Sequence, residues 1–134
     1  MTDYFEISVQ THQRTQWVNI TADIQKAVHG CRLKNGICTV SSLHTTAGIT
    51  INENADPSVQ HDILAAINLL IPLTGSYQHT EGNSAAHIKC SLLGPSQTIF
   101  IQDGRLALGT WQGIYFCEFD GPRRRKVLLR AADT

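Results

Sequence analysis

The sequence predicts an α+β fold in which a mostly antiparallel or mixed β-sheet packs with two to three helices. Several short runs alternate apolar and polar residues, as half-buried strands do. The pair Asp103-Gly104 lies between two apolar runs and is typical of a two-residue hairpin turn, which joins antiparallel neighbours. Residues 57–71 instead place apolar side chains at helical spacing. Residues 1–134 fit a single compact domain.

The first part of the chain predicts two strands and a helix. Residues 5–9 alternate apolar and polar side chains and are expected to form the opening strand, with residues 17–20 as its partner. Thr21 can cap a helix that runs to about His29. Gly30 is expected to end this helix.

Two strands and the clearest helix come next. The strands are predicted on either side of His44, at residues 36–43 and 48–52. The helix is predicted at residues 57–71, because Asp56 is a good N-cap and a proline suits the first helical position. Its apolar stripe is expected to face the core and consists of Val59, Ile63, Ile67 and Leu70.

The remainder predicts a loop, a short helix and two pairs of strands. Residues 74–84 are polar and are expected to form the loop, and a helix at 84–93 follows. The hairpin turn at 103–104 is flanked by strands at 98–101 and 105–108. The last two predicted strands, 114–119 and 124–129, flank a second turn at 120–122.

Composition narrows the class of partner. Eleven basic and eleven acidic side chains cancel, so neither nucleic acid nor an anionic membrane is expected as a partner. No run approaches the roughly 20 apolar residues of a membrane span, and the acidic, polar N-terminus lacks the pattern of a signal peptide. The four cysteines show no CxxC spacing, which favours buried thiols in a reducing compartment. A cytoplasmic protein with a small-molecule partner is therefore expected.

Three histidines in polar runs give the strongest functional signal: His44, His79 and His87. Imidazole is a common zinc ligand and the usual acid/base group near neutral pH, so together these rings would form a half-open metal or catalytic site. His44 could instead be a hydrogen-bonded structural residue at a strand end. Glu81 is a candidate base, an acceptor that holds one imidazole tautomer, or a solvated loop carboxylate.

Other polar residues lie near strand ends. Thr45 and Thr46 could orient the His44 ring or contact a ligand. Glu53 could bind a hard cation such as magnesium or position a substrate. Asp56 is sufficiently explained as a helix cap.

Two more segments have the composition of anion sites. Between Gly109 and Gly113, backbone N–H groups could cradle an anion together with the side chains of Thr110, Trp111 and Gln112. The alternative is a bend that tucks the tryptophan into the core. The basic run 123–126 would place Arg123 and Arg125 on one strand face and the other two residues, Arg124 and Lys126, on the opposite face. Arginines suit phosphate, but a charged edge strand explains the run equally well.

These motifs, taken in order, closely resemble the YjbQ-like family, which is often labelled secondary thiamine-phosphate synthase. The matching segments are 42–49 (SLHTTAGI), 52–59 (NENADPSV), 61–62 (HD), 77–79 (YQH), 87–89 (HIK), 91–94 (SLLG) and 109–114 (GTWQGI). The resemblance implies a compact α+β fold, a homotrimer and a zinc site with His44, His79 and His87 as ligands. It also puts several motif residues near the proposed cleft: Glu53, Asp56, Glu81, Thr110, Trp111, Gln112 and Arg124.

The resemblance implies a synthase that joins hydroxymethylpyrimidine diphosphate to thiazole phosphate. A metal, Arg124 and backbone N–H groups could stabilise the departing pyrophosphate. Magnesium usually has this role, whereas three imidazoles favour zinc. A zinc-dependent hydrolase of a small phosphorylated or acyl substrate, with Glu53 or Glu81 as base, is therefore an alternative. A trimeric module that binds metal or an anion without turnover is the third reading.

Overall fold

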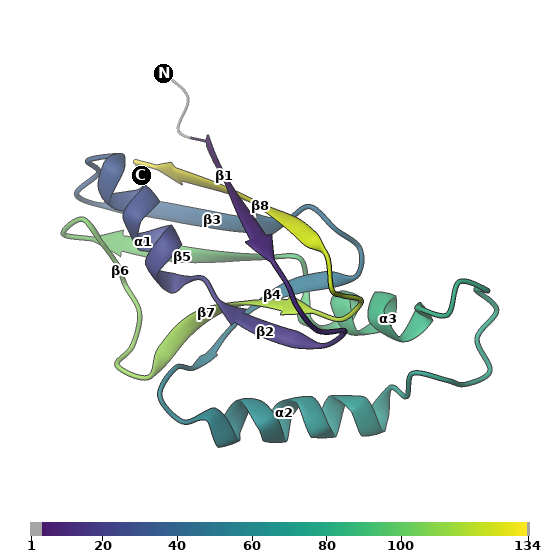
Figure 1. The fold of residues 1–134 in the computed structure, drawn as a ribbon. Coiled ribbons are helices and arrows are strands. Elements are labelled where there is room, and N and C mark those ends of the chain that lie inside the picture. Colours follow the sequence, from purple (N-terminus) through teal and green to yellow (C-terminus); the bar gives the residue numbers. More distant parts are fainter. Residues whose placement is uncertain (1–3, 134) are drawn as a thin grey trace.

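The computed structural model describes residues 4–133 and confirms the α+β prediction (Figure 1). In chain order these residues form β1 Tyr4–Gln10, β2 Gln16–Asn19, α1 Thr21–Gly30, β3 Gly36–Ser42, β4 Ala47–Glu53, α2 Pro57–Leu70, α3 Ser84–Leu93, β5 Ser96–Gln102, β6 Arg105–Leu106, β7 Gln112–Glu118 and β8 Arg124–Ala132. Within residues 4–133, no helix has the length and apolar character needed to cross a membrane.

The strands form two antiparallel sheets. The larger sheet has the order β1-β8-β3-β5-β6, and the smaller sheet has the order β2-β7-β4. Among the connections that pass from one sheet to the other, residues 43–46 join β3 to β4, and residues 119–123 join β7 to β8. They lie side by side, since the Phe119 N–H donates to the Thr46 carbonyl at 3.1 Å. The candidate site is built on these two connections.

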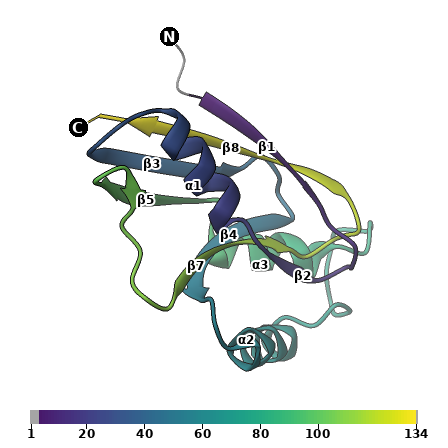
Figure 2. The ribbon, with the colours of Figure 1, turned by 60° about the vertical axis from the view of Figure 1, so that its left-hand side comes forward.

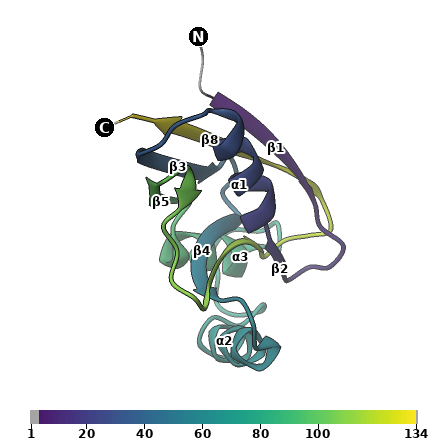
Figure 3. The ribbon, with the colours of Figure 1, turned by 90° about the vertical axis from the view of Figure 1, so that its left-hand side faces the viewer.

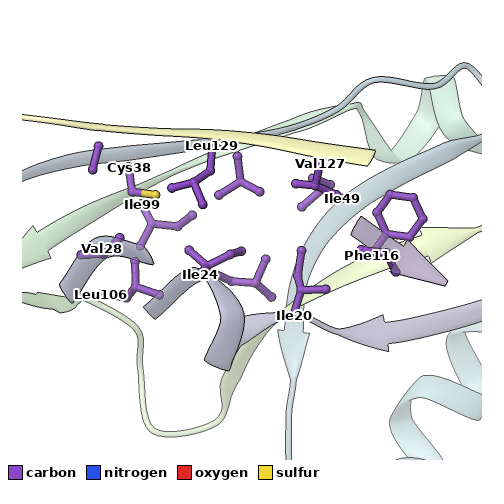
Figure 4. Close-up of a cluster of buried hydrophobic side chains, with 14 of the residues drawn as sticks. Ile20, Ile24, Val28, Cys38, Ile49, Ile99, Leu106, Phe116, Val127 and Leu129 are labelled. Atoms are coloured by element: carbon purple, nitrogen blue, oxygen red, sulfur yellow. The ribbon is translucent and has the colours of Figure 1, made fainter. Parts of the chain in front are cut away.

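The main core lies where α1 packs between the two sheets. Ile24 and Val28 of α1 are fully buried, and they share one cluster with Ile49, Phe116 and Leu129 from three strands (Figure 4). Each such side chain contributes about 1.5–3 kcal/mol through burial. Figure 2 shows α1 lying across the space between the sheets. Figure 3 shows α2 on the other side of the smaller sheet, away from α1.

The predicted partner of the opening strand is wrong. The second strand exists, but β2 pairs with β7, while β1 pairs with β8 and places Val9 opposite Arg125. The strands around residues 120–122 also lie in different sheets, so no hairpin forms there. Alternation predicts which face of a strand is buried, but it contains no information about the neighbouring strand.

The hairpin at Asp103-Gly104 is confirmed. The strands β5 and β6 pair in register, with Gln102 opposite Arg105. Asp103 and Gly104 have φ values of 51° and 77°. A two-residue hairpin turn with positive φ at both positions requires these left-handed conformations.

Helix α1 begins and ends differently from the prediction. Thr21 is its first residue, and its backbone N–H donates to the Asn19 side chain at 3.0 Å. Gly30 is the last helical residue and does not itself stop the helix. The left-handed conformation falls two residues later, on Arg32, with φ 55°.

Helix α2 has the predicted start and cap, but its apolar stripe does not face a core. Asp56 Oδ1 accepts the Ser58 N–H at 2.9 Å. No α2 residue is buried, and Leu70 is 80% exposed. Only Ile63 and Leu64 are packed against a buried cluster of the smaller sheet.

Candidate functional site

The connections 43–46 and 119–123 and the loop before α3 line an open pocket of about 390 Å³. We call it the histidine pocket. Its lining residues are Leu43, His44, Thr45, Thr46, Glu81, Asn83, His87, Asp120, Arg123 and Arg125. Two of the three predicted histidines line this pocket directly. The third, His79, lies against His87 with ring centroids 5.5 Å apart and borders a neighbouring cavity.

A buried ion pair forms the floor of the histidine pocket. Arg125 is 4% exposed and Glu118 is fully buried. Arg125 Nε donates to Glu118 Oε1 at 2.8 Å, and Nη2 donates to both Glu118 Oε2 and Thr46 Oγ1. Thr11 Oγ1 also donates to Glu118 Oε1, at 2.8 Å. The pair links β7 to β8 and so holds one arginine in a fixed orientation between the two sheets.

Hydrogen bonds keep Glu118 ionised in spite of its burial. Burial alone raises the pKa of this carboxyl, but the hydrogen bonds from Arg125, the Asp120 N–H and Thr11 outweigh it. The pKa of Glu118 is therefore lowered. Removal of either charge would leave the other one buried without compensation.

His44 is held by a backbone hydrogen bond. Its Nε2 accepts the Lys126 N–H at 2.8 Å. Burial lowers the pKa of His44, and the charge of Arg125 lowers it further, so the ring is neutral near pH 7. Because Nε2 is the acceptor, the neutral ring carries its proton on Nδ1. His44 therefore provides an N–H donor within the pocket lining.

Asn83 fixes His79 in the opposite tautomer. The Asn83 amide nitrogen donates to Asp120 Oδ2 at 2.9 Å, so its oxygen faces His79 Nε2 at 3.0 Å. His79 Nε2 must then be the donor. Glu81 Oε2 lies 3.8 Å from the same nitrogen. Its side chain is 74% exposed.

The zinc site implied by the resemblance does not fit this arrangement. Residues 4–133 contain no group of three His, Cys, Asp or Glu side chains placed to hold a metal ion. His44 Nε2 is engaged by the Lys126 N–H, so this neutral ring has a proton, not a lone pair, on its other nitrogen. His79 donates through Nε2 to Asn83 and so keeps a lone pair only on Nδ1. The arrangement in the structure therefore does not present three imidazole lone pairs to one metal ion.

The other predicted residues lie at the far end of β4. Glu53 ends this strand, whose seven residues span roughly 20 Å from Ala47 beside the histidine pocket. The Asn54 side chain and N–H bind the carbonyls of Gln112 and Trp111 at 3.0 and 2.8 Å. Trp111 is 62% exposed, so it is not tucked into the core. Thr110 lies in the same exposed turn. Within one chain these residues do not reach the histidines.

Residues of the basic run 123–126 point to opposite sides, as the alternation along a strand predicts. Arg123 and Arg125 line the histidine pocket, whereas Arg124 is exposed and does not line it. Arg123 Nη2 donates to Asp120 Oδ2 at 3.0 Å. Thr45 and Thr46 both line the pocket, and Thr46 is buried. Asp56 remains the cap of α2 and takes no part in the pocket.

Sequence reasoning missed Glu118, Asn83 and Asp120. Glu118 had a visible signal, because it is a single carboxylate in the otherwise apolar run 114–119. A charge in such a run is expected to be paired. The roles of Asn83 and Asp120 had no comparable signal, since each depends on a contact 37 residues away in the sequence.

Two proteins from other organisms match most of this chain. A UPF0047 protein of Methanocaldococcus jannaschii is 54% identical over 126 residues, which cover 94% of this chain and 91% of that protein. The UPF0047 protein YugU of Bacillus subtilis is 44% identical over 125 residues, covering 92% and 95% respectively.

Solved structures share the fold. An uncharacterized conserved protein of the YjbQ/UPF0047 family from Clostridium acetobutylicum superposes with a TM-score of 0.94 at 53% identity, covering 96% of this chain and 99% of that one. A YbjQ-like protein of unknown function from Sulfolobus solfataricus superposes with a TM-score of 0.94 at 31% identity, covering 98% and 96%. The sequence profile of one family, described as UPF0047 protein YjbQ-like, matches residues 5–134, and the chain belongs to that family.

Proposed function

We propose that this chain is an enzyme that binds a small phosphorylated substrate in the histidine pocket. The reaction we propose is the thiamine-phosphate synthase reaction that the family resemblance implies. The observation that carries the proposal is the fixed guanidinium of Arg125 on the pocket floor, held by a buried carboxylate. A rigid arginine beside neutral donors is suited to the oxygens of a phosphate or diphosphate.

Arg125 keeps part of its donor capacity for a ligand. Its Nε and Nη2 groups bind Glu118 and Thr46. Within residues 4–133 its Nη1 group has no hydrogen-bond partner. Because Arg125 lines the pocket, this nitrogen can bind an anion without releasing Glu118. The His44 Nδ1–H is a second donor of the same pocket.

These donors suit the departure of diphosphate. In the synthase reaction the thiazole nitrogen attacks the methylene carbon of hydroxymethylpyrimidine diphosphate. The bond from that carbon to the diphosphate oxygen breaks, and the diphosphate leaves with the electron pair. Arg125 and His44 stabilise the charge that grows on the leaving oxygen, and they are already oriented before the reaction begins.

Turnover of the two substrates by wild type, His44→Gln and His12→Gln tests this proposal. His12 is exposed and does not line the histidine pocket, so it is the matched control. We expect kcat/KM to fall about 100-fold in His44→Gln, the order found when one oriented donor to a transition state is removed. Substrate binding without any turnover would contradict the enzyme and favour a binding module. Equal activity in the two variants would contradict the assignment of His44.

A hydrolase of a small phosphorylated or acyl substrate is the second candidate. Glu81 favours it, because this carboxylate lines the pocket and lies beside His79. Glu81→Gln should then reduce hydrolysis of phosphate monoesters by about 100-fold, within the range for general bases. Glu53→Gln is the control, since Glu53 lies at the opposite end of β4. Equal hydrolysis in the two variants would exclude Glu81 as the base.

We also propose that the chain assembles as a homotrimer through α2 and its surroundings. The support is the number of large apolar side chains left at the surface there: Leu69, Leu70, Leu73 and Leu92. Apolar surface of this kind marks an interface. Light scattering should give three times the chain mass of 14.8 kDa. Leu70→Lys should lower that mass, whereas Phe100→Lys, on the exposed face of β5, should not.

A further inference from the structure

A second cavity, of about 1280 Å³, lies far from the histidine pocket in the fold. Its walls are one side of α1 from Ala22 to Gly30, the loop 31–35 and the turn between β5 and β6. Figure 1 shows α1 and β6 at the left end of the molecule, whereas α3, which carries His87, lies at the right. We call this second cavity the basic cavity.

The charge around the basic cavity is strongly one-sided. Four cationic side chains line it, those of Lys26, Arg32, Lys34 and Arg105, against the single carboxylate of Asp103. Within residues 4–133 none of these four cations has an ion pair or a side-chain hydrogen bond. The whole chain is formally neutral, so positive charge is concentrated here. Charges of one sign that line a concave surface raise the local concentration of an oppositely charged ligand.

The walls of the cavity are tied together by hydrogen bonds. The Gln25 side chain donates to the Gly104 carbonyl at 3.2 Å and accepts the Leu106 N–H at 2.9 Å. The Gly104 N–H donates to the Lys34 carbonyl at 2.9 Å. The helix, the loop and the hairpin turn are therefore held at fixed separations. The backbone segments that carry the four cations are therefore held in fixed positions relative to one another.

The backbone of Arg32 points to a role for its side chain. Its φ of 55° lies in the left-handed region, just after the end of α1. Glycine is the usual residue at such a position, because a Cβ atom is unfavourable there. This chain instead accepts that cost at a residue whose guanidinium lines the basic cavity. Strain of this kind is a reason to look for function.

The lining also limits the chemical class of ligand. It contains no Phe, Tyr or Trp side chain, and His29 is its one aromatic ring, so stacking on a nucleobase is a smaller part of recognition than the cations are. Lysine and arginine side chains are hydrogen-bond donors only, and arginine suits phosphate oxygens in particular. Several cations at separate points of one cavity match several linked phosphates better than a single one.

We propose that the basic cavity binds a short polyphosphate chain, either inorganic or as the triphosphate group of a nucleotide. This proposal is independent of the reaction in the histidine pocket. Recognition rests on the phosphates, so sodium triphosphate and ATP should bind with affinities that agree within a few fold. Orthophosphate should bind far more weakly, because it engages fewer of the cations.

Calorimetric titration of the intact protein with sodium triphosphate tests the proposal. Wild type should bind one triphosphate per chain in the basic cavity, beyond any bound in the histidine pocket, and this binding should weaken as salt rises. Arg32→Gln should lower the affinity about 10-fold or more, which corresponds to about 1.4 kcal/mol. Arg124→Gln is the control, because it removes the same charge from an exposed strand position outside the cavity.

A second variant separates binding from folding. Arg32→Gly removes the charge and also relieves the left-handed strain, so its thermal midpoint should be at least that of wild type while its affinity for triphosphate falls as in Arg32→Gln. The proposal is overturned by absence of binding in wild type, by equal loss in Arg32→Gln and Arg124→Gln, or by equal affinity for orthophosphate. Tighter binding of a single-stranded oligonucleotide than of triphosphate would also overturn it, since the ligand would then be a nucleic acid.

Discussion

Glu118 and Arg125 are the two residues on which the histidine pocket depends most. Both are buried, and the carboxylate is bound by Arg125, Thr11 and the Asp120 N–H. Arg125→Met leaves that carboxylate buried without its counter-charge. The free energy of unfolding should fall by about 3–5 kcal/mol, measured by urea denaturation.

An exposed ion pair on the same strand provides the control. Lys126 Nζ lies 3.5 Å from Glu6 Oε1, and both side chains are about half exposed. Water and salt screen such a pair, so Lys126→Met should cost less than about 1 kcal/mol. Similar losses in the two variants would show that burial of the Glu118 pair has no special effect on stability.

His44 should make stability depend on pH. Its folded-state pKa is lowered, chiefly by burial, so the unfolded chain binds a proton at His44 more readily than the folded chain does. Its contribution is present above the ordinary pKa of 6.5 and is lost as the pH falls through the lowered folded value. Urea denaturation between pH 7 and 5 should show a shallower loss in His44→Gln than in wild type. Parallel curves would contradict the lowered pKa.

Some site residues could be predicted one by one, and others could not. The three histidines were visible because they are rare, polar-flanked side chains, and the structure gathers His44 and His87 at one pocket. The ring tautomers of His44 and His79 were not visible, because they are set by Lys126 and Asn83, which are distant in sequence or belong to a loop. The contribution of a side chain to a site depends on partners that a local pattern does not specify.

At the scale of elements, substitution by alanine is expected to have opposite effects on stability at two glycines. A Cβ atom at Gly48 of β4 would lie 2.7 Å from the Gly94 carbonyl oxygen, which also accepts the Ile49 N–H. Gly48→Ala must therefore push the end of α3 away from β4. It should destabilise the fold by about 1–3 kcal/mol, measured by thermal unfolding.

The last residue of α1 supplies the comparison. At Gly30 a Cβ atom would meet no heavy atom within 4 Å. Because alanine loses less backbone entropy than glycine in a helix, Gly30→Ala should stabilise the fold by up to about 1 kcal/mol. A loss of stability in Gly30→Ala, or none in Gly48→Ala, would show that the packing around these elements is assigned incorrectly.

The existence and approximate position of the elements were predictable, but their pairing was not. The period of apolar residues located the strands and helices, and Asp103-Gly104 located the one hairpin. The periodic pattern gave no reason for β3 and β4 to part into different sheets around His44. That separation depends on long-range pairing with β7 and β8, which local sequence does not encode.

At the scale of the whole molecule, the two sheets divide the motif residues. The histidine pocket forms where the chain passes between sheets, while Glu53 and the 109–113 turn lie at the other end of β4. Residues that belong to the motifs of one family therefore need not lie close together in one chain. In the same way, the apolar stripe on α2 predicted a buried helix, but no α2 residue is buried within this chain.

If the chain assembles through α2 as proposed, the exposed helix also affects the chain before assembly. In the single chain α2 is attached mainly through Ile63 and Leu64, and its leucines are open to water. Such a segment opens locally at little cost and is accessible to proteases and chaperones. Deuterium uptake at α2 should fall as the protein concentration rises, while uptake at α1 stays constant. Assembly would then determine the lifetime of the chain in the cell as well as its shape.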